Sequence, residues 1–454
     1  MATDLQRSAP RVHFICSSCG AEAPKWQGRC PACEAWNSLT EAAVRLTARG
    51  TAGVAAAAST PLEAVMAAPA RVDPSGSFEL DRVLGGGIVP GSVVLLGGDP
   101  GIGKSTLALQ VAHACGDQAS PALYCSGEES LEQLALRARR LGCGGARVRL
   151  LVESDVDTVI ATIEAERPSL VVVDSVQTLR DAAMAGPPGS VSQVRAAVLR
   201  MSDVAKATGV PVLLVGHVTK EGAIAGPRTL KHMVDVVLYL EGERLGEHRL
   251  LRGIKNRFGA TGEVGLFSMV RDGMRDLAAP GRGMLDGASL GAAGSVLTVT
   301  CDGLRPMAVE VQALAVASPF EFPRRTASGF ELNRLHLMLA VLARRAGIAL
   351  PRLDVFVNVA GGVRLTDPGA DLAVALAVTG SALDRVLSPT CAVIGELGLG
   401  GEVRRVSRTE VRLAEAAAVG MEAVMLPDSF RGTVPNGLRC HRVRNVCEAV
   451  ALLG

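Results

Sequence analysis

The residues best suited to chemistry lie between positions 98 and 106. In order they are Gly98, Asp99, Pro100, Gly101, Ile102, Gly103, Lys104, Ser105 and Thr106. The spacing from Gly98 to Ser105 fits a phosphate-binding loop, in which backbone N–H groups and the following helix N-terminus bind phosphate. There Lys104 contacts the terminal phosphates and Ser105 binds Mg²⁺. A glycine-rich turn without a ligand does not require Lys-Ser at this spacing, so we predict an ATP and Mg²⁺ site.

Acidic residues end two of the apolar segments that follow this loop. Asp174 closes the apolar run that begins at Leu170, which is the Walker B arrangement that positions Mg²⁺. Glu128 follows the run near 121–126, where an acid can deprotonate the attacking water. Ser126 or Ser130 with the nearby acids also predicts a helix start, so one of Glu128 and Glu129 can be catalytic while the other caps.

Alternating strands and helices must position these side chains. We predict strands near 92–98, 121–126, 147–151, 170–176 and 211–218. Helices are expected near 104–115, 129–141, 156–166 and 190–207. This alternation predicts an α/β fold with a parallel sheet covered by helices. After residue 232 consecutive strands, near 234–240 and 249–254, indicate an antiparallel extension.

Four of the eleven cysteines form two Cys-x2-Cys pairs near the start of the chain. They are Cys16, Cys19, Cys30 and Cys33. Four thiolates at this spacing predict a structural Zn²⁺ ribbon, with a redox dithiol pair or disulfides as alternatives. Four ligands leave no open position, so we expect no catalysis at the metal. Trp26 and Trp36, the only tryptophans, are expected to cap its small core.

Length and composition set limits on the rest of the chain. At 454 residues it suggests about three domains. A formal charge of +2 is too small to imply a nucleic acid or an acidic membrane as partner. The sequence has no N-terminal signal and no uninterrupted apolar stretch of about 18 residues, so we expect a cytoplasmic protein without a membrane partner.

We predict four segments along the chain. A zinc ribbon covers residues 1–46, a linker 47–72, a P-loop ATPase domain 73–280, and a second α/β domain 281–454. In the last segment we expect strands near 295–300, 307–314, 354–360, 392–397 and 423–426. Its helices are expected near 330–346, 369–382 and 408–419.

Several motifs together resemble the bacterial RadA (Sms) family of DNA-repair proteins. They are Gly-Glu-Glu-Ser at 127–130, Ser-Val-Gln-Thr at 175–178, the segments 189–195 and 216–222, and Lys-Asn-Arg-Phe-Gly at 255–259. The order of zinc ribbon, RecA-like ATPase and C-terminal domain matches too. The resemblance implies a homo-hexameric, DNA-dependent ATPase that binds single-stranded and branched DNA and drives branch migration with the RecA recombinase. A RecA-like signalling ATPase that does not bind DNA is an alternative.

The resemblance also implies roles for individual residues. Glu128 takes the place of the catalytic glutamate, and His217 that of a γ-phosphate sensor, although from the residues alone a core histidine is equally compatible. Lys255 and Arg257 would reach the neighbouring subunit's nucleotide, the alternative being a solvated basic strand end. Two loops, 180–192 and 219–230, would follow the DNA backbone, unless their cations are merely solvated. Those cations are Arg180, Arg195, Lys220 and Arg228. With only 3% aromatic residues, we expect no base-stacking platform.

Residues 365–371 and 394–421 resemble segments of Lon-type proteases. Those enzymes use a Ser–Lys dyad, and the matching positions here hold Gly369 and Glu410. From residue 294 onward the sequence contains no lysine at all. An ATP-dependent protease or unfoldase is therefore an alternative function, but we predict that this domain is not proteolytic.

Overall fold

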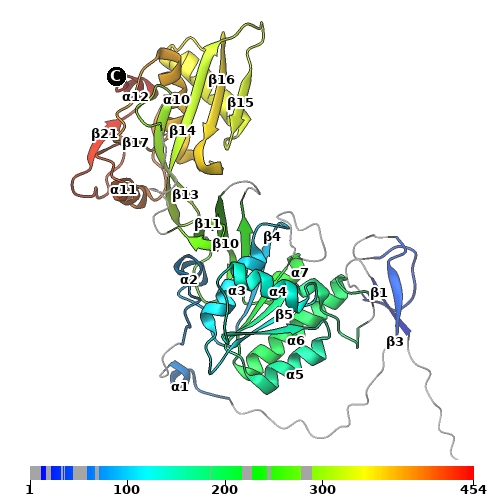
Figure 1. Ribbon diagram of the computed structural model, residues 1–454. Helices are drawn as coiled ribbons and strands as arrows, with labels where there is room; N and C mark the ends of the chain where they lie inside the picture. Colours follow the sequence, from blue (N-terminus) through cyan, green and yellow to red (C-terminus); the bar gives the residue numbers. More distant parts are fainter. Residues whose placement is uncertain are drawn as a thin grey trace, which may run out of the picture. The chain divides into compact units, whose positions relative to one another are not determined.

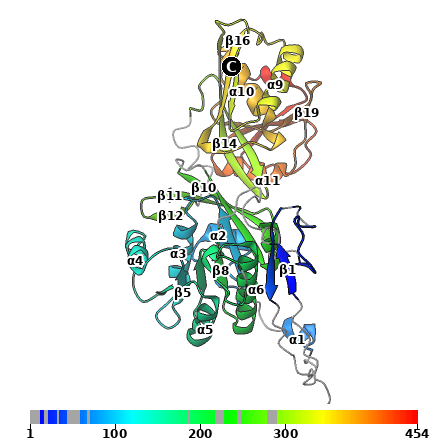
Figure 2. The ribbon, with the colours of Figure 1, turned by 90° about the vertical axis from the view of Figure 1, so that its right-hand side faces the viewer.

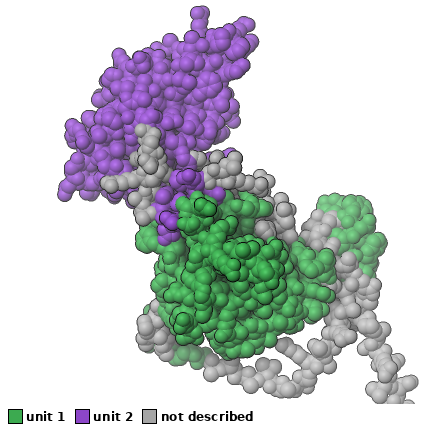
Figure 3. All heavy atoms as spheres, in the orientation of Figure 1, with its two compact units in different colours: residues 1–241, 251–261, 269–274 green, residues 242–250, 262–268, 275–454 purple. Residues whose placement is uncertain are grey.

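The computed structural model describes residues 12–16, 22–31, 34, 36–43, 59–66, 71–184, 186–216, 227–242, 247–277 and 289–454. The chain divides into two compact units, which Figure 3 shows in different colours. The first unit comprises residues 1–241, 251–261 and 269–274, and the second comprises 242–250, 262–268 and 275–454. No helix within these described ranges is long and apolar enough to cross a membrane.

A small antiparallel sheet forms the N-terminal ribbon. Its strands, in spatial order, are β2 (Glu22–Ala23), β1 (Val12–Cys16) and β3 (Leu39–Ala43). The buried cluster beside them consists of Cys16, Ala23, Cys30 and Leu39. The expectation that the tryptophans cap this core is wrong, because Trp26 is 56% and Trp36 73% exposed. The short helix α1 (Leu62–Met66) lies within the stretch that we predicted as a linker.

The largest sheet has nine strands. In spatial order they are β12 (Gly273–Asp276), β11 (Val264–Val270), β10 (His248–Asn256), β9 (Val236–Glu241), β4 (Val93–Gly98), β8 (Val212–Val215), β7 (Val171–Asp174), β5 (Ala122–Ser126) and β6 (Val148–Val152). The six strands from β9 to β6 pair in parallel. Their carboxyl ends therefore share one edge of the sheet, as predicted for an α/β core.

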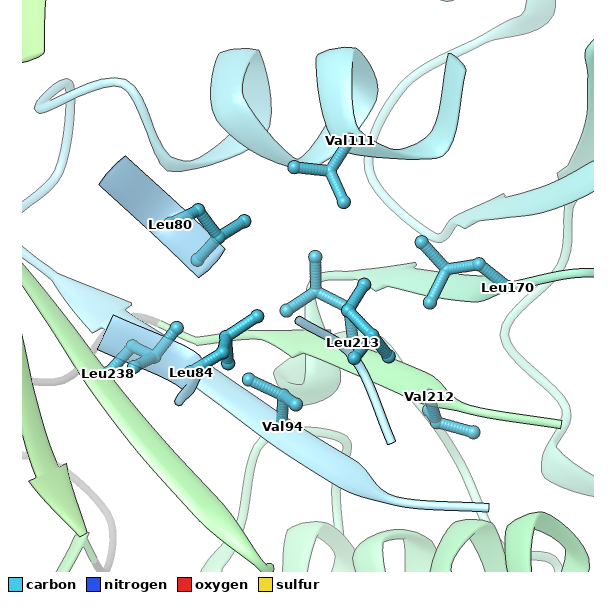
Figure 4. A pocket seen from close by; sticks show the side chains of 9 residues that line it. Leu80, Leu84, Val94, Val111, Leu170, Val212, Leu213 and Leu238 are labelled. Carbon is cyan, nitrogen blue, oxygen red and sulfur yellow. The ribbon is translucent and has the colours of Figure 1, made fainter. Parts of the chain in front are cut away.

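Helices cover both faces of this sheet (Figures 1 and 2). They are α2 (Phe78–Leu84), α3 (Lys104–Cys115), α4 (Leu131–Arg140), α5 (Val156–Glu166), α6 (Val191–Thr208) and α7 (Pro227–Met233), with the 3-10 turn η1 (Val176–Thr178) after β7. Successive side chains of β4 point to opposite faces of the sheet. Val93 and Leu95 pack with residues of α5 and α6 on one face, whereas Val94 faces α2 and α3 on the other. On that second face the structure contains an apolar pocket (Figure 4), lined by Leu80, Leu84, Ile88, Val94, Val111, Leu170, Val212, Leu213 and Leu238. None of its lining residues belongs to the phosphate-binding loop.

The second unit contains a seven-stranded mixed sheet. In spatial order its strands are β15 (Arg325–Ser328), β16 (Leu353–Val359), β14 (Arg305–Ala317), β13 (Ser295–Asp302), β17 (Cys391–Val393), β20 (Ala423–Pro427) and β21 (Arg439–Val443). Its helices are α9 (Leu332–Val341), continued by the π-turn η2 (Leu342–Ala346), α10 (Asp371–Leu383), α11 (Thr409–Ala418) and α12 (Val446–Val450). Two 3-10 turns, η3 (Ala360–Gly362) and η4 (Pro368–Ala370), and a hairpin of β18 (Glu396–Leu397) and β19 (Val403–Arg404) complete it. Helix α10 packs with one face of β13 and β14, and α11 with the other.

Candidate active site

The phosphate-binding loop joins the buried strand β4 to helix α3. Gly98, Gly101 and Gly103 have φ angles of +148°, +79° and +113°, which favour glycine. At Gly98 the need is also steric, because a Cβ would lie 2.5 Å from the carbonyl oxygen of Leu240. The N-cap residue Gly103 provides no side-chain hydrogen bond to the first turn of α3. The N–H groups of that turn are therefore suited to binding an anion.

Lys104 lies almost wholly buried at the start of α3. Its Nζ donates to the carbonyl oxygens of Gly98 at 2.8 Å and Asp99 at 2.9 Å. Burial lowers the pKa of Lys104, and the nearby carboxylates of Asp174, Asp99 and Glu128 oppose that shift. Ser105 and Thr106, half-buried, complete the first turn. The lysine thus holds the loop through two carbonyl groups that a phosphate can replace as partners for its ammonium group.

Asp174 ends β7, at the edge of the sheet to which the phosphate-binding loop also belongs. Its Oδ2 accepts a hydrogen bond of 2.6 Å from the hydroxyl of Tyr124, and Arg137 Nη1 lies 3.9 Å from the same oxygen. Burial and the neighbouring carboxylate raise the pKa of Tyr124, so its hydroxyl remains a donor. Carboxylate and hydroxyl oxygens are ligands that Mg²⁺ prefers, so Asp174 and Ser105 fit that ion.

Glu128 and Glu129, whose roles the sequence did not distinguish, have different surroundings. Glu128 is exposed, and its Oε1 accepts a hydrogen bond of 2.7 Å from the buried hydroxyl of Ser175. Glu129 forms an ion pair with Arg137 on α4. The helix start predicted at Ser130 is confirmed, because Ser130 and Gln133 form the capping box of α4, but neither Glu128 nor Glu129 belongs to that box, so the part of the prediction in which a glutamate caps is wrong.

The register of the parallel strands explains why these groups converge. Ser126 of β5 lies beside Asp174 of β7, and Asp174 lies beside Val215 of β8. Val215 in turn lies beside Leu96 of β4, two residues before the loop. A lysine, an aspartate and a glutamate therefore meet at the carboxyl edge of neighbouring strands, where α/β sheets bind ligands. This arrangement can hold a phosphate group and activate a water molecule near it.

Comparison with known proteins identifies the family. The DNA repair protein RadA of Bacillus subtilis is 45% identical over 452 residues, covering 96% of this chain and 97% of its own. RadA of Mycobacterium tuberculosis is 46% identical over 445 residues, covering 97% and 92%. This chain belongs to the RadA family of DNA repair proteins. That confirms the resemblance on which we based the residue roles.

Two family models match parts of this RadA-family chain, and two solved structures align with about half of it. Residues 64–223 match a model described as an AAA domain, and residues 14–41 match a rubredoxin metal binding domain. A KaiC-like protein from Pyrococcus horikoshii is 20% identical and aligns with 46% of this chain and 99% of its own, with a TM-score of 0.38. A RadB recombinase is 26% identical and aligns with 45% and 98%, with a TM-score of 0.36. The predicted nucleotide-binding domain and zinc ribbon are confirmed by the two family models.

The zinc ribbon of this RadA-family chain brings together one cysteine from each pair. Cys16 and Cys30 are both buried in the same small cluster, and Cys16 Sγ donates to Ser38 Oγ at 3.1 Å. Cys19 and Cys33 lie outside the described residues. Soft thiolates from two Cys-x2-Cys turns suit Zn²⁺, and the two described cysteines share one buried cluster, which is compatible with that arrangement.

The Lys-Asn-Arg-Phe-Gly segment begins with the last two residues of β10 and has partners within its own chain. Lys255 Nζ donates to the carbonyl oxygens of Lys231 at 2.7 Å and Val234 at 2.6 Å. Burial lowers the pKa of Lys255, as does the charge of Arg257, while Asp235 opposes the shift. Arg257 Nη1 lies 2.9 Å from Asp235 Oδ1, and its side chain is half exposed. The segment therefore connects the end of β10 to the residues just before β9.

Asn256 in the same segment binds backbone groups on two sides. Its Nδ2 donates to the carbonyl oxygens of Val83 and Leu84 at the end of α2, at 3.2 and 2.9 Å. Its Oδ1 accepts from the backbone N–H groups of Phe258 and Gly259. Asn256 thus fixes the turn that carries Arg257, a role that its sequence position did not reveal.

The predicted DNA contacts are only partly within the described residues. Arg180 and Arg195 are both exposed. His217 and Lys220 lie outside the described residues, as does the side chain of Arg228. Between the two exposed arginines the buried side chain of Gln193 donates to the carbonyl oxygens of Asp181, Met184 and Gly186. Gln193 therefore anchors this loop to α6, and sequence analysis gave it no role.

Proposed function

We propose that this RadA-family chain is a DNA-dependent ATPase that binds single-stranded DNA and drives branch migration of recombination intermediates together with RecA. Membership of the family makes it a DNA repair protein, and the AAA domain makes it a nucleotide-binding one. The observation that carries the ATPase assignment is the convergence of Lys104, Asp174 and Glu128 at one edge of the sheet. We further propose the predicted domains at 1–46, 73–280 and 281–454, with the linker 47–72 between the first and the second.

In this proposal each group has a distinct chemical role. The loop N–H groups and Lys104 neutralise the phosphates. Ser105 and Asp174 would hold Mg²⁺, which supplies further positive charge to the phosphates when it is bound. Glu128, exposed and oriented by Ser175, accepts a proton from the attacking water. His217 would sense the γ-phosphate.

Lys255 and Arg257 are proposed to act on the nucleotide of a neighbouring subunit in a homo-hexamer. The half-exposed side chain of Arg257 supports this role, whereas the two carbonyl partners of Lys255 also allow a structural one. Mixing experiments distinguish the two roles. We expect a Lys104→Ala subunit and a Lys255→Ala subunit each to be inactive alone, and their mixture should recover ATP turnover only if Lys255 acts across an interface. A mixture without recovery would leave Lys255 with a role inside its own chain.

The DNA contacts are assigned to the two loops after β7 and β8. Arg180 and Arg195 are exposed beside a loop that Gln193 anchors, and Lys220 and Arg228 extend the same set. Such phosphate contacts predict binding that weakens steeply with salt and has little sequence preference.

A protease function has no support at the position where a Lon-type serine would lie. A Cβ at Gly369 would lie 2.9 Å from Arg412 Nη1, so the guanidinium fills the space that a serine hydroxyl needs. Glu410 stands where the dyad lysine would be, and its Oε1 accepts a hydrogen bond from the backbone N–H of Thr433. We therefore propose a non-proteolytic role for residues 281–454 in assembly or DNA contact.

The decisive experiment measures ATP hydrolysis and branch migration by the full-length chain, with and without single-stranded DNA and RecA. We expect DNA to stimulate hydrolysis, and Lys104→Ala to abolish both activities. Lys206→Ala is the matched control, since this exposed lysine lies on α6 of the same domain. A hydrolysis rate that single-stranded DNA leaves unchanged at low salt would refute the motor, and hydrolysis retained by Lys104→Ala would refute the site.

A further inference from the structure

The zinc ribbon exposes the two largest apolar side chains that it possesses. Among the described residues of the ribbon, the buried apolar cluster consists of Cys16, Ala23, Cys30 and Leu39, yet Trp26 is 56% and Trp36 73% exposed. Tryptophan is highly buried on average, and a small domain gains most from burying it. Exposed indoles on such a small core therefore indicate a surface that binds a partner.

The two rings gather around one backbone position. A Cβ at Gly28 would lie 3.8 Å from Trp36 Cζ3 and 4.0 Å from Trp26 Cη2, so both rings approach the same residue. Backbone contacts fix this arrangement, because Arg29 and Trp36 form an antiparallel bridge and Asn37 N donates to the carbonyl oxygen of Gly28 at 2.8 Å. The indoles are thus held by the turns that carry the second cysteine pair.

Cations flank these rings. Lys25 precedes Trp26 and is exposed, and the guanidinium of Arg29 lies 5.9 Å from the centroid of the Trp36 ring. Arg29 also pairs with Glu34, but both side chains are more than half exposed, so that pair is weak and can exchange for a phosphate. Aromatic rings with adjacent cations are the combination that binds unpaired nucleotides, by base stacking and by phosphate contact.

We propose that Trp26 and Trp36 form a stacking platform for the bases of single-stranded DNA, with Lys25 and Arg29 contacting its phosphates. Only unpaired bases expose a face to an indole, so duplex DNA is not a ligand of the platform. The inference rests on the proposed DNA-binding function, and it adds a second DNA contact to the loops of the ATPase domain. It also reverses the expectation, drawn from low aromatic content, that the chain lacks such a platform.

The test uses the fact that these are the only two tryptophans in the sequence, so their fluorescence reports on the platform alone. The full-length chain is titrated with poly(dT), and intrinsic fluorescence is followed beside the anisotropy of a labelled oligonucleotide. We expect quenching that saturates together with the anisotropy, and none with duplex DNA. Trp26→Phe and Trp36→Phe, each with one reporter left, should both still be quenched.

Substitution of the rings measures their share of the affinity. Trp26→Ala and Trp36→Ala should each weaken oligonucleotide binding about 5- to 150-fold, the range expected for loss of one stacked base. Phe322→Ala, which removes an exposed aromatic side chain of the second unit, should leave binding unchanged. Retention of one zinc ion per chain shows that the ribbon still folds. If an alanine variant loses zinc, the phenylalanine variants replace it, with a smaller loss of affinity expected.

Two outcomes would overturn the platform. In one, anisotropy saturates while the fluorescence and the affinities of the tryptophan variants do not change, so DNA binds elsewhere. In the other, quenching occurs only on addition of a protein such as RecA, so the surface binds protein. If no oligonucleotide binds the chain at all, the proposed function fails as well.

Discussion

Replacing Ser175 by alanine tests whether Glu128 is the general base and whether its orientation matters. The Ser175 hydroxyl is fully buried and donates at 2.7 Å to Glu128 Oε1, whereas the glutamate itself is exposed. Ser175→Ala therefore removes the contact that orients the carboxylate and leaves the carboxylate in place. We expect turnover to fall with little change in nucleotide affinity.

The size of the effect follows from the two environments. A typical hydrogen bond contributes about 0.5–1.5 kcal/mol, and because solvent reaches Glu128 we take this range rather than the larger one for buried charges. If all of that energy orients the base, turnover falls about 2- to 13-fold. Removing the base itself with Glu128→Gln should cost about 100- to 10,000-fold, the usual contribution of general base catalysis.

The assay is steady-state ATP hydrolysis with saturating single-stranded DNA, beside nucleotide affinity measured by equilibrium binding. Ser202→Ala is the matched control, since Ser202 is a buried serine that donates to Val198 within α6, away from the site. In the Glu128→Gln background, Ser175→Ala should have no further effect on turnover. Full additivity of the two substitutions, or a loss of nucleotide affinity with unchanged turnover, would refute the orienting role.

Three further predictions concern stability. Burial raises the pKa of Asp371 to about 7, although the charge of Arg334 opposes this shift. The folded chain therefore favours the neutral acid. The stability that this provides is complete below pH about 4 and is lost as the pH rises through about 7. The free energy of unfolding of the wild-type chain, measured in urea, should therefore fall between pH 5 and pH 8 relative to that of Asp371→Asn. The same pH dependence in both proteins would contradict this. Arg412→Ala leaves Asp367, whose side chain is 11% exposed, without its ion-pair partner at 2.5 Å. The loss should cost about 3–5 kcal/mol in the unfolding transition of the second unit, and a change below about 1 kcal/mol would show that water replaces the guanidinium. Cys30→Ser should release zinc and unfold the ribbon, while the ATPase domain keeps its thermal transition, and a single merged loss of structure would show that the ribbon does not fold independently.

Sequence patterns predicted the interior of both sheets better than their edges. Helix α3 begins and ends at the predicted residues, 104 and 115, because the phosphate loop marks its start and its apolar positions continue without a break. The strands that sequence analysis missed include β12, β15 and β21, each at the edge of its sheet. Segments such as Arg-Thr-Ala-Ser in β15 have no apolar run, since an edge strand buries little and is commonly polar.

In the candidate site, too, some residues could be predicted from local sequence and others could not. Lys104, Asp174 and Glu128 could be predicted because each lies within a local motif whose chemistry depends on short spacing. Tyr124 and Ser175 could not, because each acts on a partner about fifty residues away, to which only the strand register brings it. Local spacing therefore predicts which groups react, whereas the tertiary structure determines which groups hold them.

The exposure of the two ribbon tryptophans also depends on the tertiary structure and not on residue type. Because an indole ring is large and mostly apolar, a prediction from residue type alone places Trp26 and Trp36 in the core of the ribbon. What prevents this is the size of the ribbon. Among its described residues the buried apolar cluster consists of four small or medium side chains, and the backbone bridge between Arg29 and Trp36 helps to hold the rings outside that cluster. A metal-stabilised domain does not need its largest side chains for folding, because ligand binding supplies the folding free energy. Those side chains are then available for binding, which explains how a domain with so small a core can keep both of its indoles exposed.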